Sequence, residues 1–197
     1  LPNKYYHFFN RAIGNEKIFV TEGNYYFFLD KLKLYITPIA DIYCYCLLPN
    51  HYHFLIKIKN EVEIDGYKLL LKESNRLQND FHNIEDFIMQ QFSNFHNSYT
   101  KALNKLFTRK GRLFLESFQR KEIVEESYFT KIIHYIHTNP IHHGFVKDFK
   151  DWRFSSYNSL LSNSSTQLKR EEVFNWFGGK EKFILFHSLT NFNTKHS

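Results

Sequence analysis

The sequence predicts an α+β fold because strand-like and helix-like patterns follow one another along the chain. Strand-like patterns cover four segments, residues 5–11, 39–47, 51–56 and 112–124. Helical spacing of apolar residues covers three more, residues 21–36, 84–107 and 127–139. The first six segments in chain order read β-α-β-β-α-β, as in a ferredoxin-like domain, whose antiparallel sheet carries helices on one face. The seventh segment is an extra helix.

The first half of this order has clear local signals. Residues 5–11 form the first strand. A helix follows with Thr21 as its cap and Pro38 beyond its end, because apolar residues recur on one face: Tyr25, Phe28, Leu29, Leu32 and Ile36. The strand Ile39–Leu47 then reaches the His51 strand through a Pro49-Asn50 turn, which predicts a β-hairpin.

The middle of the chain is less uniform. Residues 60–83 are polar and only hint at a short element, through Val62, Tyr67, Leu70 and Leu71. A long helix is predicted over Ile84–Phe107, stopping near Gly111, because apolar residues keep helical spacing: Ile88, Phe92, Phe95, Tyr99 and Leu103. Arg112–Val124 is predicted to be a strand or an irregular hairpin.

We expect residues 1–150 to form the main domain and residues 151–197 a C-terminal tail. A polar run over Ser162–Ser165 is typical of a linker, and weaker helical structure follows over Glu171–Phe186, interrupted at Gly178-Gly179. This last segment carries several large apolar residues: Val173, Phe174, Trp176, Phe177 and Phe183. The tail is therefore expected to dock on the domain.

The 197-residue chain is long enough to bury a core. It has no apolar run of about 18 residues that could span a membrane, and its start lacks the apolar core of a signal peptide. Cys44 and Cys46 lie two apart in a predicted strand, where disulfides rarely form. We expect reduced, buried cysteines in a cytoplasmic protein. A Cys-x-Cys metal pair is a less favoured alternative.

His51 and His53 flank Tyr52 in the predicted strand over residues 51–56. Successive strand side chains point to opposite faces, so the two histidines emerge together while Tyr52, Phe54 and Ile56 point the other way. Imidazole is the commonest nitrogen ligand for divalent metals. The alternative is a pair of polar residues on a solvated face, so the pair needs further residues to indicate a site.

The extra helix supplies those residues. Its core-facing stripe is Phe129, Ile132, Ile133 and Ile136, with Ser127 as the expected N-cap and Pro140 ending the helix after Asn139. Tyr135 and Asn139 are neighbours at i and i+4 on one flank. A hydroxyl and an amide oxygen would project together, as a nucleophile and a third metal ligand. Tyr128, two turns earlier, is the rival nucleophile.

Four segments in this order and spacing resemble the REP-associated tyrosine transposases, a branch of the single-tyrosine HUH transposases and nucleases: Tyr6–Arg11, Leu48–His53, Gln91–Lys101 and Tyr135–Val146. The resemblance implies cleavage and rejoining of single-stranded DNA through a 5′-phosphotyrosine. It also implies hairpin-forming DNA as the partner. Relatives often carry glutamine at the position of Asn139, whose amide oxygen still suits a hard cation.

The excess positive charge is concentrated in one part of the chain. The net charge is +6, and between Lys101 and Lys121 all charged residues except Glu116 are basic: Lys101, Lys105, Arg109, Lys110, Arg112, Arg120 and Lys121. We expect these residues, together with Arg11, to bind DNA, because polyanion binding uses concentrated basic surfaces. Phe107, Phe114 and Phe118 could stack on unpaired bases, or simply fill the core.

The predicted mechanism uses His51, His53 and Asn139 to bind Mg²⁺ or Mn²⁺, which acts as a Lewis acid on the scissile phosphate, while the Tyr135 oxygen attacks phosphorus. A protein that only binds nucleic acid and a phosphodiesterase that uses water are the alternatives. The remaining histidines, His134, His137, His142 and His143, are expected to be solvated or to contact phosphate. We expect one chain to form the whole site, in a monomer or weak homodimer.

Overall fold

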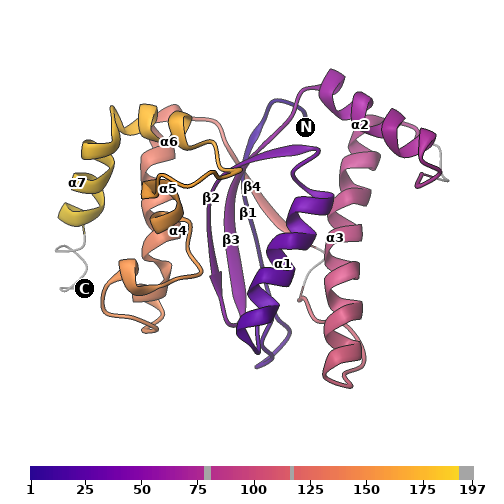
Figure 1. Cartoon of the computed structure of the whole chain (residues 1–197), viewed down its shortest axis with the longest axis horizontal. Helices are drawn as coiled ribbons and strands as arrows, with labels where there is room; N and C mark the ends of the chain where they lie inside the picture. Colours follow the sequence, from indigo (N-terminus) through magenta and orange to yellow (C-terminus); the bar gives the residue numbers. More distant parts are fainter. Residues whose placement is uncertain (78–80, 116–117, 191–197) are drawn as a thin grey trace.

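The computed structural model of the chain describes residues 1–77, 81–115 and 118–190. Within these residues, four strands form one antiparallel sheet in the order β2-β3-β1-β4 (Figure 1): β1 (Tyr5–Arg11), β2 (Ala40–Leu48), β3 (His51–Ile58) and β4 (Gln119–Ile123). The two central strands, β1 and β3, are separated in the sequence by the helix α1 (Glu22–Tyr35) and the strand β2. This topology confirms the predicted α+β fold class.

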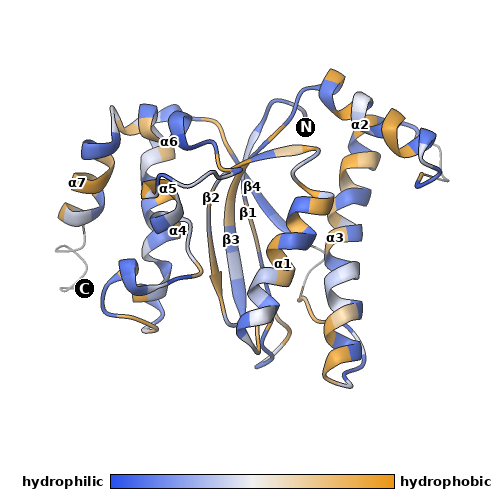
Figure 2. Cartoon of the chain, in the orientation of Figure 1, coloured by the Kyte–Doolittle hydropathy of each residue, from blue (hydrophilic) through white to orange (hydrophobic). Residues whose placement is uncertain are grey.

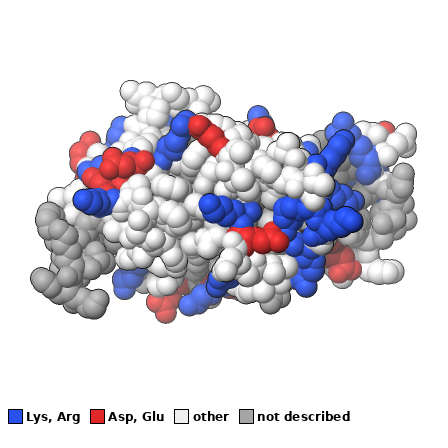
Figure 3. Space-filling view, turned by 90° about the horizontal axis from the view of Figure 1, so that it is seen from below, with Lys and Arg blue, Asp and Glu red and all other residues white. Residues whose placement is uncertain are grey.

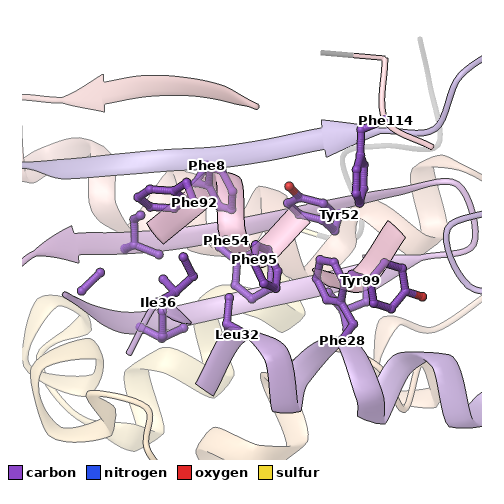
Figure 4. Packing of buried hydrophobic residues seen from close by; sticks show 14 of the residues in the cluster. Phe8, Phe28, Leu32, Ile36, Tyr52, Phe54, Phe92, Phe95, Tyr99 and Phe114 are labelled. Carbon is purple, nitrogen blue, oxygen red and sulfur yellow. The ribbon is translucent and has the colours of Figure 1, made fainter. Parts of the chain in front are cut away.

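Two helices, α1 (Glu22–Tyr35) and α3 (Ile84–Leu106), cover one face of the sheet (Figure 1). Hydrophilic and hydrophobic residues alternate along both helices, as expected where only one side is buried (Figure 2). Their aromatic and aliphatic side chains meet those of the strands in one core, where Phe28, Phe95 and Tyr99 pack around Tyr52 and Phe54 (Figure 4).

The predicted boundaries of α1 and α3 hold. Thr21 is the N-cap of α1, and the side-chain oxygen of Asn24 accepts the backbone N–H of Thr21 at 2.9 Å. The α3 helix begins after Asn83, whose side chain accepts the N–H of Asp86 at 2.8 Å. Both helices thus begin where a side chain satisfies free backbone groups of the first turn.

The α2 helix (Glu61–Glu73) was not predicted, although residues 60–83 hinted at a short element. Ile64 is its one fully buried residue, while Tyr67 and Leu71 are partly buried against the core. Its signal is a capping box, in which Asn60 accepts the N–H of Glu63 and the Glu63 carboxylate accepts from Asn60. This local pair indicates where the helix begins.

The α4 helix (Phe129–His142) covers the opposite face of the sheet from α1 and α3 (Figure 1). Its stripe Ile132, Ile133 and Ile136 is buried, in a second core that includes Tyr43 and Leu55. The predicted start was wrong, because Ser127 lies inside a short 3₁₀ turn (Glu126–Tyr128) and Tyr128 occupies the N-cap position.

The predicted end of α4 was also wrong, since Pro140 lies inside the helix. Proline there removes one backbone donor but leaves the carbonyls of the last turn available. The helix ends at His142 with His143 as its C-cap, and Gly144 follows with a φ of 71°. Around it, Phe145 N–H bonds the Pro140 carbonyl and Gly144 N–H bonds the Ile141 carbonyl, both at 2.9 Å. This is the Schellman arrangement, which only glycine adopts without strain.

The chain after α4 packs against α4 and β2 through α5 (Tyr157–Leu161), α6 (Arg170–Phe177) and α7 (Lys180–Thr190), with a 3₁₀ turn (Phe149–Asp151) before them. The predicted interruption at Gly178-Gly179 is confirmed, because the left-handed Gly178 ends α6. Cys44 and Cys46 are free and buried, as predicted. No helix in the described part of the chain is long and apolar enough to cross a membrane.

Candidate active site

The paired histidines lie on the central strand β3, on the face that α4 covers. His53 pairs with Phe9 of β1 and Cys46 of β2, which places it in the middle of the sheet. Tyr52, Phe54 and Ile56 enter the opposite core, as the strand alternation predicted. The rings of His51 and His53 lie 5.3 Å apart, with planes at 84°.

The α4 helix brings Tyr135 and Asn139 to these histidines. The Tyr135 ring lies 5.7 Å from the ring of His53, and 43% of the residue remains exposed to solvent. Asn139, one turn later, is buried, and its Oδ1 atom lies 3.2 Å from Nε2 of His51. The structure therefore gathers His51, His53, Tyr135 and Asn139 within a single chain.

His51 contacts two side-chain oxygens but can donate a proton to only one of them. Its Nδ1 atom lies 2.8 Å from the side-chain oxygen of Asn50, and its Nε2 atom faces the oxygen of Asn139. Burial lowers the pKa of His51, although the contact with Asn139 opposes the shift. A neutral imidazole has one N–H, so it cannot donate to both oxygens. If Nδ1 donates to Asn50, two lone pairs meet between His51 and Asn139.

A divalent cation would resolve this conflict. Ligands at about 2.1 Å from an octahedral cation lie about 3 Å apart, close to the separation of His51 Nε2 and Asn139 Oδ1. In this orientation of the amide, the Nδ2 atom of Asn139 is buried and has no hydrogen-bond partner among the described residues. His51, His53 and Asn139 could therefore hold a divalent cation.

The third ligand would have to be this amide. Across the described residues, no three His, Cys, Asp or Glu side chains are grouped as a metal cluster. His51 and His53 supply nitrogen, and Asn139 supplies the neutral oxygen that hard cations accept. Because these three side chains are neutral, the affinity for a cation would depend on how they are arranged.

His7 is a member of the site that the sequence analysis missed. Its Nε2 atom lies 2.9 Å from Nδ1 of His53, and both residues are buried. Burial, together with the charge of Lys121, lowers the pKa of His7 to about 4. Burial and the neighbouring imidazoles lower the pKa of His53 to about 2. Strand alternation alone could not show that β1 would pair with β3 and bring His7 there.

These groups open into a pocket of about 250 Å³, lined by Phe9, Asn10, Arg11, Asn50, His51, His53, Gln119, Tyr135 and His143. Arg11 is the one predicted DNA-binding residue in this lining. Gln119 and His143 were not predicted to be site residues, and the His143 ring lies 4.5 Å from that of His51. The pocket thus brings the guanidinium of Arg11 beside His51, His53 and Tyr135.

The other basic residues are distributed over several surfaces. Lys and Arg side chains gather on the underside of the molecule, more densely on the half that carries α1 and α3 (Figure 3). Lys105, Lys110 and Arg112 are exposed, whereas Arg109 forms an ion pair with Glu16. Lys101 lines a separate groove between α2 and α3. Glu116, the acidic exception in this segment, lies outside the described residues.

Arg120 and Lys121 are separated by the pleat of β4. Lys121 pairs with His7 and lies on the face of the active site, near the ring of Tyr128. Arg120 pairs with Phe8 and points to the opposite face, where it lies over the ring of Phe118. The two predicted DNA-binding neighbours therefore cannot contact the same stretch of DNA in the same way.

The expectation for His137 needs correction, and the structure also locates the rival nucleophile Tyr128. His137 is fully buried rather than solvated, and it lies between Ser156 Oγ at 2.8 Å and His187 Nε2 at 3.0 Å. It anchors α4 to the chain that follows. Tyr128 lies under Lys121, and among the described residues no ring contact joins it to His51 or His53.

Comparison with known proteins gives one structural match and no sequence match. No protein-family model matches the sequence, and no curated protein is significantly similar to it. A solved structure described as a REP-associated tyrosine transposase bound to a REP hairpin is similar in fold, with a TM-score of 0.54. The similarity covers 83% of this chain and 82% of that chain, at 16% identity. The chain therefore shares the fold of that transposase.

Proposed function

We propose that this protein is a metal-dependent single-stranded DNA endonuclease or transposase that cleaves and rejoins DNA through a phosphotyrosine at Tyr135. The observation that carries the proposal is the position of Tyr135 beside His53 in this pocket, together with the contact of Asn139 with His51. The fold similarity to a transposase that binds a REP hairpin supports DNA as the substrate.

Each residue then has a distinct role. The phenol oxygen of Tyr135 attacks phosphorus in line, the bond to the 3′ oxygen breaks, and the 5′ end stays on the protein. The phenol loses its proton and the departing 3′ oxygen gains one. His51, His53 and Asn139 would hold Mg²⁺ or Mn²⁺, which supplies Lewis-acid stabilisation of the phosphate charge when bound. Attack by the 3′-hydroxyl of another strand reverses the step and joins the DNA.

Arg11 is placed to orient the phosphate chain. It lines the same pocket as Tyr135 and the two histidines. Guanidinium groups bind phosphate through two parallel hydrogen bonds, which fixes the approach of the scissile bond to the tyrosine. Lys121 of β4 lies on the same face of the sheet and adds a second positive charge to it. The preferred substrate is single-stranded DNA next to a hairpin.

Covalent capture tests the proposal directly. The protein is incubated with Mn²⁺ and 5′-labelled and 3′-labelled single strands that carry hairpins, and the products are separated under denaturing conditions. A protein-linked DNA carrying only the 3′ label is expected, because the 5′ phosphate of the downstream fragment stays on Tyr135. Cleavage without an adduct would indicate attack by water, and binding without cleavage would indicate an inactive nucleic-acid-binding module.

A further inference from the structure

We propose that His7 is a positioning residue that keeps the proton of His53 on Nδ1 and so directs the Nε2 lone pair of His53 toward the pocket. The inference rests on the proposed function, in which His53 is a metal ligand. Its basis is the contact between Nε2 of His7 and Nδ1 of His53, at 2.9 Å.

The pair is held in a rigid environment. His7 and His53 are 8% and 7% exposed, and their rings lie 5.1 Å apart with planes at 25°. The ring of Phe9 stacks on both, at 4.7 Å from His7 and 5.8 Å from His53. The pairing of β1 with β3 fixes the backbone positions of both residues, and burial among these rings restricts rotation of the imidazoles.

Only one direction of this hydrogen bond is compatible with metal binding. If Nδ1 of His53 donates to Nε2 of His7, Nε2 of His53 has a free lone pair. If His7 donates, His53 carries its proton on Nε2 and cannot bind a cation. Histidine ligands of metals generally donate their second N–H to a fixed acceptor, which sets the tautomer.

The neighbouring histidine is arranged in the same way. Nδ1 of His51 lies 2.8 Å from the Asn50 oxygen, which can accept its proton. Asn50 and His7 therefore perform the same task for His51 and His53. His7 also meets the nucleophile, because its ring lies 6.1 Å from Tyr135 with planes at 82°. One side chain thus contacts both a proposed metal ligand and the proposed nucleophile.

Two substitutions at this position separate hydrogen bonding from shape. In His7→Gln the amide oxygen can still accept from Nδ1 of His53, whereas His7→Met fills the space without a comparable acceptor. We expect His7→Met to weaken Mn²⁺ binding by about 10- to 100-fold, as for other outer-shell partners of metal ligands. His7→Gln should keep close to wild-type affinity. Calorimetric titration of each protein with Mn²⁺ measures this.

The control is His96→Met. His96 is equally buried, on the opposite face of the sheet, where it bonds Tyr52 at 2.6 Å. Its replacement should reduce stability but leave Mn²⁺ affinity unchanged, so a general loss of packing is distinguished from loss of the His7 contact. Wild-type Mn²⁺ affinity in His7→Met would overturn the proposal.

A second measurement uses no metal and no DNA. Long-range ¹H–¹⁵N spectra report which imidazole nitrogen carries the proton, and they should show His53 protonated on Nδ1 in the wild type and in His7→Gln. Protonation on Nε2 in the wild type would overturn the assignment, even if His7→Met failed to fold. If wild-type protein formed no DNA adduct, the proposed function would fail, while the tautomer of His53 would still decide the role of His7.

Discussion

Asn139 Oδ1 lies 3.2 Å from His51 Nε2, and this contact joins the helix α4 to the central strand β3 at the candidate active site. The amide is buried, yet its nitrogen has no hydrogen-bond partner among the described residues. A buried polar group without a partner usually costs about 1–3 kcal/mol. The position of Asn139 is therefore better suited to ligand binding than to stability.

The first prediction follows from that cost. Asn139→Leu removes the unpaired amide and keeps a side chain of similar volume, so the unfolding free energy should fall by no more than about 1 kcal/mol or should rise. Mn²⁺ affinity should drop sharply, because the oxygen ligand is gone. Urea denaturation and calorimetric titration measure the two quantities. A large loss of stability together with unchanged Mn²⁺ affinity would identify Asn139 as a structural residue.

The second prediction concerns the nucleophile. Tyr135→Phe removes one oxygen from a side chain that is 43% exposed, so stability should change by no more than about 0.5 kcal/mol. Formation of the covalent DNA adduct should be abolished. Tyr128→Phe is the matched control, since Tyr128 lies on the same side of the sheet but contacts Lys121 instead of the histidines. An adduct that persists in Tyr135→Phe and disappears in Tyr128→Phe would reverse the assignment.

The third prediction separates DNA binding from metal binding. Lys121→Ala and Arg11→Ala should weaken binding of single-stranded DNA and reduce its salt dependence by about one unit each, since each removes one phosphate contact. Arg120→Ala, on the other face of β4, should have little effect. His53→Ala should retain most of the DNA affinity while losing cleavage. Fluorescence anisotropy over a range of salt concentrations checks all four. Equal losses for Arg120 and Lys121 would argue that DNA contacts both faces.

The fourth prediction concerns assembly. The four site residues meet within one chain, and His137 anchors α4 to Ser156 and His187 of the same chain. A mixture of Tyr135→Phe and His51→Ala proteins should therefore remain inactive, because neither chain lends its helix to the other. Cleavage well above that of either variant alone would show that α4 is exchanged between subunits.

The fifth prediction is a pH dependence of stability. Burial lowers the pKa of His187 to about 3, with a small opposing effect from its bond to the Phe183 carbonyl. In the unfolded chain this imidazole takes up a proton below about pH 6.5, but in the folded protein it does so only near pH 3. The unfolded state therefore binds more protons in this range, and stability is full above pH 6.5 and falls with acidification.

The contribution of one such histidine is about 1.4 kcal/mol per pH unit. In His187→Gln the amide can still accept from His137 but does not titrate, so the slope of unfolding free energy between pH 4 and 6 should decrease by about that amount. Urea denaturation at several pH values gives the slope. Identical slopes in the two proteins would mean that His187 is protonated in the folded state.

The sequence by itself determined the element types and the chemical groups of the site. Strand alternation placed His51 and His53 on one face, and helical spacing placed Tyr135 and Asn139 on one flank, because both relations depend only on local backbone geometry. Helix α2 was missed, since it buries a single apolar residue. The extension of α4 through Pro140 was missed because its end depends on the carbonyl contacts of Gly144 and Phe145.

Only the tertiary structure decided how these groups combine. The pairing of β1 with β3 brings His7 to His53, and the pleat of β4 sends Lys121 toward the site and Arg120 away from it. The packing of α4 on the sheet carries Asn139 across to His51. Such relations join residues far apart in the sequence, and a local pattern contains no information about which strands become neighbours or at what register.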